Sequence, residues 1–592
     1  MRDMLKTIVA FFFLSAFFIV SGSCKKNISG EDTGGDNGGE TDNKYPVIID
    51  SNYNPSDPPA SATIGFFGDA WSAKTFVVPE IISGIVPDAA ATDSLTIDVN
   101  KVLVKVPAYV YGNNSNLWMG QVVTQPDLMQ YIKDLAPHII RAPAGSVSDV
   151  YFWNGTADFP APADAPSTLL NADGSSTASN YAWYGGNTAS WTFSLDNYYK
   201  LLSQTNSTGI ITINYGYARY GTSANPVAAA AHLAADWVRY DKGRTKFWEI
   251  GNETYGNWEA GYRIDVSQNK DGQPEYITGA LYGQHFKVFS DSMKAAAQQV
   301  GATIYIGASL YERPVNAGDP VSQTWNQGVL EKAANTPDYF IVHNYFTPYN
   351  ANTSAADILA TATTEPANVM SYIKQQLTAA GVSPKPIAMT EWNIRATGSK
   401  QNVSYIAGMH VAKTLGAIIK NQYGEASRWD LANGYDNGDD QGLFNIGDEP
   451  NAPLWNPRPA YFYQYYFYKF FGDRMVYDTL RASNADINTY SSTFSTGQAG
   501  SVIINSGTYS HVVSVDFQHF PAGSKYYWYV LTGGTDNGEF SGQVLVNGTG
   551  PSTPTGGPLN YATVKAYSAP LNGTIKISVP PRSVVYLSAD KK

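Results

Sequence analysis

Two glutamates stand where apolar, strand-like runs of the sequence end. Glu253 closes the run Phe247-Trp-Glu-Ile-Gly-Asn, and Glu391 follows Pro386-Ile-Ala-Met-Thr. Cleavage of an acetal needs a proton for the leaving oxygen and stabilisation of a positive centre, and two facing carboxyl groups can supply both. If both runs are strands of one parallel barrel, the two carboxyls emerge at the same rim. The pair therefore predicts chemistry on a glycosidic bond, with Glu253 and Glu391 as the catalytic residues.

The segments that must position these glutamates alternate between strand-like and helix-like patterns from about Lys105 to Asp473. The predicted strands cover residues 104–113, 138–143, 209–214, 246–250, 303–307, 339–343, 387–389 and 429–432. The predicted helices cover residues 124–135, 225–243, 279–300, 366–380 and 403–420. Continuous apolar strands separated by amphipathic helices indicate a parallel sheet that is covered on its outside, and eight such units close into a (β/α)8 barrel.

The pattern changes after Gly472, where short, β-branched and aromatic segments are separated by Gly, Asn and Pro. Such spacing is typical of a β-sandwich. Two earlier segments, residues 62–67 and 94–99, also look like strands, and we expect them to pair with this C-terminal domain. The predicted fold is thus a (β/α)8 TIM barrel over residues 101–472 with a C-terminal antiparallel β-sandwich over 473–592, which includes N-terminal strands from 46–100.

The first 24 residues have the pattern of an export signal. Arg2 and Lys6 precede an apolar run from Ile8 to Val20, which is too short for a permanent membrane span. Small residues then lead to Cys24, the only cysteine, in a pattern that resembles the lipobox of bacterial lipoproteins. Residues 25–45 are polar and Gly-rich, as in a flexible tether. We therefore expect an exported bacterial lipoprotein of the outer membrane, lipidated at Cys24.

Composition narrows the class of ligand. With 43% hydrophobic and 15% charged residues, the 592-residue chain is not disordered throughout. Its formal net charge of −11 disfavours nucleic acid and anionic lipid as partners. The sequence shows no Cys/His cluster and no phosphate-binding Gly loop, so no metal and no cofactor is predicted. A polysaccharide or oligosaccharide fits better, and an aromatic content of 13% mildly favours sugar stacking.

Three motifs carry a resemblance to a known group of enzymes. Trp248-Glu-Ile-Gly-Asn-Glu253 and Thr390-Glu-Trp-Asn resemble the acid/base and nucleophile motifs of glycoside hydrolase clan A. Ile139-Ile-Arg-Ala-Pro-Ala-Gly-Ser146 resembles the second-strand motif of its arabinofuranosidase-like members, although Ala142 and Ala144 replace an aromatic residue and a Gly that are usual there. The resemblance spans about residues 101–472. It implies a retaining hydrolase in which Glu253 is the acid/base and Glu391 the nucleophile.

The resemblance also implies a set of residues that bind sugar. Asn252 would contact the hydroxyl beside the reacting carbon, and His343 or Tyr345 would touch the nucleophile. Arg141 could hold the carboxylate of Glu391 by a charge-assisted hydrogen bond. Trp392 is the preferred stacking platform, because it adjoins the nucleophile. The remaining predicted sugar-binding residues are Asn113, Asn214 and Trp118, whereas Trp153 and Trp258 are weaker stacking candidates.

Two other classes of function remain open from the sequence. A non-catalytic glycan-binding surface lipoprotein could keep the barrel as a scaffold, but it would need no pair of glutamates. A polysaccharide lyase would need a basic cleft for uronates and a Tyr or His base. Both rivals explain the strand-end pair Glu253 and Glu391 less well than a glycoside hydrolase does.

Overall fold

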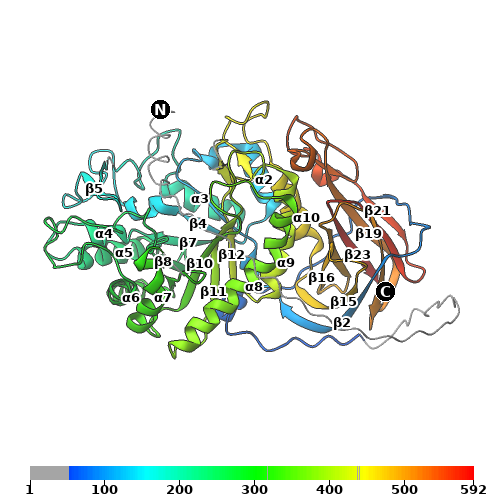
Figure 1. The fold of residues 1–592 in the computed structure, drawn as a ribbon, viewed down its shortest axis with the longest axis horizontal. Helices are drawn as coiled ribbons and strands as arrows, with labels where there is room; N and C mark the ends of the chain where they lie inside the picture. The colour runs from blue at the N-terminus through cyan, green and yellow to red at the C-terminus, as the bar shows by residue number, and fades with distance from the viewer. Residues whose placement is uncertain (1–52, 144, 180, 316–317, 436–437, 439) are drawn as a thin grey trace. The chain divides into compact units, whose positions relative to one another are not determined.

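The computed structural model describes residues 53–592 except 144, 180, 316–317, 436–437 and 439 (Figure 1). Cys24, the export signal and the tether lie outside the described residues, so these assignments stay predictions. None of the helices in the described part has the length and apolar character needed to cross a bilayer.

Eight parallel strands close into a barrel in the order β10-β11-β12-β3-β4-β7-β8-β9. The strands are β3 (Gly112–Asn114), β4 (Ile139–Ala142), β7 (Thr208–Ile213), β8 (Phe247–Ile250), β9 (Tyr305–Ser309), β10 (Tyr339–Tyr345), β11 (Ile387–Asn393) and β12 (Glu425–Arg428). Nearly all of their residues are buried, because helices cover the outside of the barrel (Figure 1). The predicted fold class is confirmed.

The helices follow the strands in the alternating pattern of a (β/α)8 barrel. They are α2 (Pro126–Leu135), α3 (Leu195–Thr205), α4 (Gly216–Tyr220), α5 (Pro226–Asp241), α6 (Gly279–Gln299), α7 (Pro320–Ala333), α8 (Ala355–Ala379), α9 (Tyr405–Lys420) and α10 (Pro459–Phe470). Asn225 caps α5 as its sequence suggests, since its side chain accepts from the backbone N–H of Ala228. Helix α8 begins well before the predicted start at Pro366, which lies inside the helix.

The first and eighth predicted barrel strands were misplaced. The run that begins at Val104 ends a strand of the other sheet, and only Gly112–Asn114 joins the barrel. The eighth strand is Glu425–Arg428 and not residues 429–432. Its sequence, Glu-Ala-Ser-Arg, looks polar, yet all four residues are buried, and Glu425 accepts a hydrogen bond from Ser427 inside the barrel. A polar strand of this kind escapes a search for apolar runs.

The predicted strand at residues 62–67 is also wrong, since this segment leads into the 3-10 helix η1 (Gly65–Ala70). Phe66 and Phe67 pack against rings at the starts of barrel strands. The Phe66 ring stacks on Tyr305 at 3.8 Å between centroids, and Phe67 lies 4.9 Å from Phe247. Phe67 is fully buried. The segment therefore closes the amino-terminal end of the barrel, which leaves the carboxyl-terminal end for the glutamates.

The C-terminal domain is a mostly antiparallel sheet of eleven strands with its own apolar core. Strand β2 (Asp93–Lys105) pairs with β15 and β18 of the C-terminal part, which confirms the expected N-terminal contribution. Alternate residues of β2 are buried, as a half-covered strand requires. The other strands are β1 (Ile81–Ser83), β15 (Arg474–Arg481), β16 (Ile487–Thr493), β17 (Ala499–Asn505), β18 (His511–Gln518), β19 (Ala522–Gly533), β20 (Val544–Val546), β21 (Ala566–Pro570), β22 (Ile575–Val579) and β23 (Ser583–Lys591).

Two small sheets complete the fold. Strands β5 (Thr168–Leu170) and β6 (Ser176–Ala178) form a hairpin between β4 and α3, and β13 (Ala432–Asn433) pairs with β14 (Phe444–Asn445) after β12. The sheet domain packs on the barrel through α9 and α10. For example, Tyr586 of β23 donates a hydrogen bond to the carbonyl of Tyr463. The large sheet thus supports the helical layer of the barrel.

Candidate active site

Glu253 is placed by a turn directly after strand β8. Gly251 has a φ of +74°, and a Cβ at this position would lie 2.9 Å from the Cβ of Tyr215. Only glycine fits such a turn without strain. The turn directs Asn252 and Glu253 over the carboxyl-terminal end of the barrel, where (β/α)8 proteins place their reactive groups.

Glu391 lies inside strand β11, next to strand β10. The register pairs His343 with Glu391, so the two residues lie side by side. Tyr345 lies two residues after His343 and therefore faces the same way along the strand. Its hydroxyl donates to Glu391 Oε2 at 2.8 Å. The strand pairing thus brings two hydrogen-bonding side chains of β10 to the carboxylate of β11.

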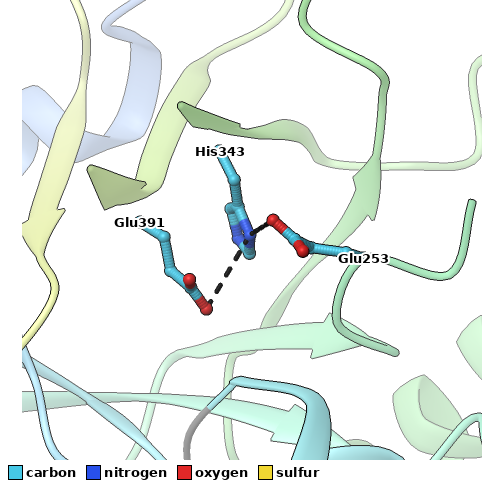
Figure 2. A group of neighbouring side chains, drawn as sticks. All are labelled: Glu253, His343 and Glu391. Carbon is cyan, nitrogen blue, oxygen red and sulfur yellow. Dashed lines mark hydrogen bonds and ion pairs between the residues drawn. The ribbon is translucent and has the colours of Figure 1, made fainter. Parts of the chain in front are cut away.

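The carboxylates of Glu253 and Glu391 converge on His343 (Figure 2). His343 Nδ1 lies 3.1 Å from Glu253 Oε1 and 3.8 Å from Glu391 Oε1. One oxygen of each carboxylate and one nitrogen of the imidazole lie within 4.8 Å of one another. This separation agrees with the roughly 5–5.5 Å between the carboxyl groups of retaining glycosidases and is too short for the roughly 6.5–9.5 Å of inverting ones.

Arg141 links Glu391 to the interior of the barrel. Its Nη1 donates to Glu391 Oε1 at 2.7 Å and to Asn114 Oδ1 at 3.0 Å. Its Nε donates to Glu249 Oε2 at 2.6 Å, and its Nη2 donates to Asn252 Oδ1 at 2.8 Å. The side chain is fully buried. One guanidinium therefore fixes the Glu391 carboxylate and the amide beside Glu253 together.

The charges of His343 and Glu253 depend on each other. Burial disfavours the imidazolium, but the charge of Glu391 and the hydrogen bond to Glu253 outweigh it and raise the pKa of His343. Burial likewise favours a neutral Glu253, but the hydrogen bond and charge of His343, together with Arg395 and Trp258, outweigh burial and lower the pKa of Glu253. Trp258 Nε1 also donates to Glu253 Oε2 at 3.0 Å. In the ligand-free site, these contacts thus favour an ionised Glu253 beside a protonated His343.

The same three side chains have the composition of a metal site. Within the described ranges, Glu253, His343 and Glu391 are the one group of His and acidic residues close enough to bind a metal ion together. However, Arg141 lies against Glu391, and the raised pKa of His343 favours a second positive charge. The surrounding charges therefore favour a protonated His343 between these carboxylates over a metal ion bound by all three side chains.

Three predicted sugar-binding residues do not reach a ligand surface. Trp392 is 1% exposed and packs beside the ring of Phe346, so it offers no open face for stacking. Asn113 is fully buried, and its Oδ1 accepts from Gln464 of α10, outside the barrel. Arg141 is also fully buried and contacts Glu391 rather than solvent. Trp392 and Asn113 are thus buried in this structure and their roles as sugar contacts stay predictions, whereas Arg141 contacts Glu391.

Two other predicted residues lie at the carboxyl-terminal end of the barrel but contact different partners. Asn214 donates to the carbonyl of Tyr151 and accepts from the backbone N–H of Tyr217, so it orders the loop after β7. Trp118 is half-buried, and its Nε1 donates to Asn433 Oδ1 at 3.0 Å. The Trp118 ring lies 6.2 Å from the ring of Trp429, which follows strand β12. Trp118 and Trp429 thus form an aromatic pair at the carboxyl-terminal end of the barrel.

Asn114 and Glu249 act from inside the strands and were not among the predicted site residues. Asn114, rather than Asn113, contacts Arg141, because neighbouring residues of a strand face opposite sides of the barrel wall. Glu249 was overlooked although it is a charged residue in the middle of an otherwise apolar strand. A charged residue inside an apolar strand indicates a buried ion pair, since a buried charge needs a partner, so Glu249 could have been identified from the sequence.

Comparison with known proteins agrees with this geometry at the level of fold. The search found no matching family model and no matching curated protein. An α-L-arabinofuranosidase from Thermotoga maritima matches with a TM-score of 0.58 and 16% identity, over 84% of this chain and 99% of that chain. A GH44 xyloglucanase from Paenibacillus polymyxa matches with a TM-score of 0.54 and 12% identity, over 85% of this chain and 100% of that chain. The chain therefore has the fold shared by these clan A glycoside hydrolases.

Proposed function

We propose that the protein is a retaining glycoside hydrolase that cleaves O-glycosidic bonds in a polysaccharide or its oligosaccharides. The observation that carries the proposal is the short separation of the Glu253 and Glu391 carboxylates at the carboxyl-terminal end of the barrel. The similar structures support it by analogy, since they include arabinofuranosidases, a xyloglucanase and a bifunctional glucanase-xylanase.

In the first step, a carboxylate oxygen of Glu391 attacks the anomeric carbon while Glu253 gives its proton to the glycosidic oxygen, which leaves as an alcohol. Arg141 and Tyr345 donate hydrogen bonds to the Glu391 carboxylate and hold it in place. In the second step, Glu253 takes a proton from water, the water oxygen attacks the anomeric carbon, and the Glu391 carboxylate is released.

The first step requires a protonated Glu253, although its pKa is low in the ligand-free site. Burial alone raises this pKa, but the hydrogen bond and charge of His343, with smaller effects of Arg395 and Trp258, together outweigh burial. A sugar that separates His343 from Glu253 leaves burial to dominate, and burial favours the neutral acid. Substrate binding thus prepares Glu253 to donate its proton.

The rival functions fit the site less well. A glycan-binding protein has no need for a carboxylate pair that Arg141, Tyr345 and His343 hold together. A lyase uses a Tyr or His base near a cation that binds a uronate. Here Tyr345 has a pKa raised well above its usual value, because burial and the charge of Glu391 oppose its ionisation, so it is a poor base.

The test is a screen of polysaccharides, followed by analysis of the first product by NMR. We expect release of a saturated sugar whose anomeric configuration equals that of the cleaved bond. An inverted product would contradict the two-step mechanism, and an unsaturated product would show a lyase. Binding without any turnover across the panel would support the glycan-binding alternative.

We also propose that the protein is an exported lipoprotein of the outer membrane, anchored through Cys24. The support is the charged and apolar start of the sequence before its single cysteine. Expression of the full chain in a Gram-negative host with labelled palmitate should label the wild type, and Cys24→Ala should lose the label and leave the membrane fraction. A Cys24→Ala variant that stays in the membrane fraction would contradict a lipid anchor.

A further inference from the structure

The amide of Asn252 is held from two sides. Its Oδ1 accepts from Arg141 Nη2 at 2.8 Å, and its Nδ2 donates to Glu259 Oε1 at 2.9 Å. These contacts fix which end of the amide is oxygen and which is nitrogen, because a guanidinium only donates. The Nδ2 group has a second N–H, which makes no hydrogen bond to any of the described residues. This N–H is the one left for a ligand.

A ligand group should meet this N–H. Asn252 adjoins Glu253, and the same guanidinium that binds Asn252 also binds Glu391. A sugar joined to Glu391 would therefore lie beside the Asn252 amide. Because a buried N–H without an acceptor costs free energy, a contact that forms as the sugar approaches Glu391 favours the reaction.

Glu259 is an unusual partner for this amide. Its side chain is 4% exposed, and its Oε1 accepts from both Asn252 and Ser146. Its Oε2 is buried and has no hydrogen-bond partner among the described residues. No lysine or arginine of the described chain forms an ion pair with it. A carboxylate in such a position would be costly, so the neutral acid is the stable form.

The charged groups near Glu259 also favour its neutral form. Burial raises the pKa of Glu259 well above its usual range, and the nearby charges of Asp149 and Glu253 raise it further. Burial raises the pKa of Asp149 to about 7, although hydrogen bonds from the backbone N–H groups of Gly216 and Tyr215 and the charge of Arg141 oppose this rise. A neutral Glu259 adds no negative charge beside Glu253, whose charge must change in each turnover.

We propose that Glu259 is a positioning residue that holds the amide of Asn252 so that its second N–H meets the substrate hydroxyl beside the reacting carbon. Glu259 itself does not touch the sugar. It acts as an uncharged acceptor, in a place where a cation or a second carboxylate would disturb Glu253. The inference deepens the proposed glycosidase function and rests on it.

The first test compares Glu259→Gln with Glu259→Leu. The amide oxygen of Gln can still accept from Asn252, so we expect kcat/KM within about 3-fold of wild type. Leu removes the acceptor, and we expect kcat/KM to fall about 30-fold on the 4-nitrophenyl glycoside that the wild type cleaves fastest, mostly in kcat. A Gln variant as impaired as the Leu variant would overturn the proposal.

A second substrate separates positioning from general damage to the fold. The second substrate is the matching glycoside that lacks the hydroxyl beside the reacting carbon. On it, the kcat/KM of Glu259→Leu should differ from that of wild type by less than about 3-fold, because neither enzyme can form the contact between Asn252 and this hydroxyl. The matched control is Glu425→Leu, which removes another buried carboxyl of the barrel. Glu425→Leu should lower kcat/KM for both substrates by the same factor. If Glu259→Leu also lowered kcat/KM for both substrates by the same factor, the proposal would be overturned.

A third measurement needs no turnover. Crystal structures of wild type and Glu259→Leu should show the Asn252 amide held against Arg141 in the first and rotated in the second. An unmoved amide would overturn the role of Glu259 even if the enzyme is active. If wild type cleaves no glycoside but the Asn252 amide rotates in Glu259→Leu, the proposed function is wrong, while the role of Glu259 in holding Asn252 is supported.

Discussion

Glu391→Ala is expected to lower kcat by about 10,000-fold or more, because the variant has no group that can form the covalent bond to the sugar. The acid Glu253 remains, as do the residues that surround the site. Added azide should restore part of the activity, since this small anion fits the space left by the carboxylate. The measurement is the rate of cleavage of an activated aryl glycoside with and without azide.

The product of the azide reaction gives the sharper result. Direct attack by azide on the face that Glu391 used should yield a glycosyl azide of opposite anomeric configuration, whereas wild type gives retention. Glu331→Ala, at an exposed position on α7, is the control and should match wild type without a response to azide. Activity of Glu391→Ala close to that of wild type would remove Glu391 from its proposed role.

The fold was largely predictable because most barrel strands are continuous apolar runs. Strands β4, β7, β8, β9, β10 and β11 all overlap the predicted segments. The failures have a common cause, which is that apolar character does not tell a strand of the barrel from other buried structure. Phe66 and Phe67 close the barrel end from a 3-10 helix, and the buried strand β12 carries polar side chains, with Ser427 hydrogen-bonded to Glu425 inside the barrel.

The residues of the candidate site that lie at the ends of barrel strands could be predicted from the sequence. Glu253, Glu391, His343 and Tyr345 follow from motifs on strands β8, β10 and β11, and the structure brings their side chains together. Register and side-chain direction could not be read from the sequence. They decide that Asn114 rather than Asn113 meets Arg141, that the ring of Trp392 is buried, and that a loop residue, Glu259, reaches Asn252.

Arg141→Met is expected to lower the free energy of unfolding by about 3–5 kcal/mol and to remove most of the activity. The variant leaves Glu249 buried without its cation and Glu391 without its strongest donor. Arg141→Lys should recover stability only in part, because one ammonium group cannot reach the four acceptors that the guanidinium fork spans. Urea unfolding followed by fluorescence, together with kcat, measures both effects.

Arg458→Met provides the matched control, because Arg458 is an equally buried arginine whose Nε donates to Glu449 Oε2 at 2.9 Å. We expect it to lose stability by a similar amount while the folded fraction keeps its kcat, since Glu449 does not contact Glu253 or Glu391. A folded Arg141→Met variant with wild-type kcat would show that Glu391 needs no cation to stay in position. The difference between the two variants therefore separates the role of Arg141 in holding the nucleophile from the general cost of breaking a buried ion pair.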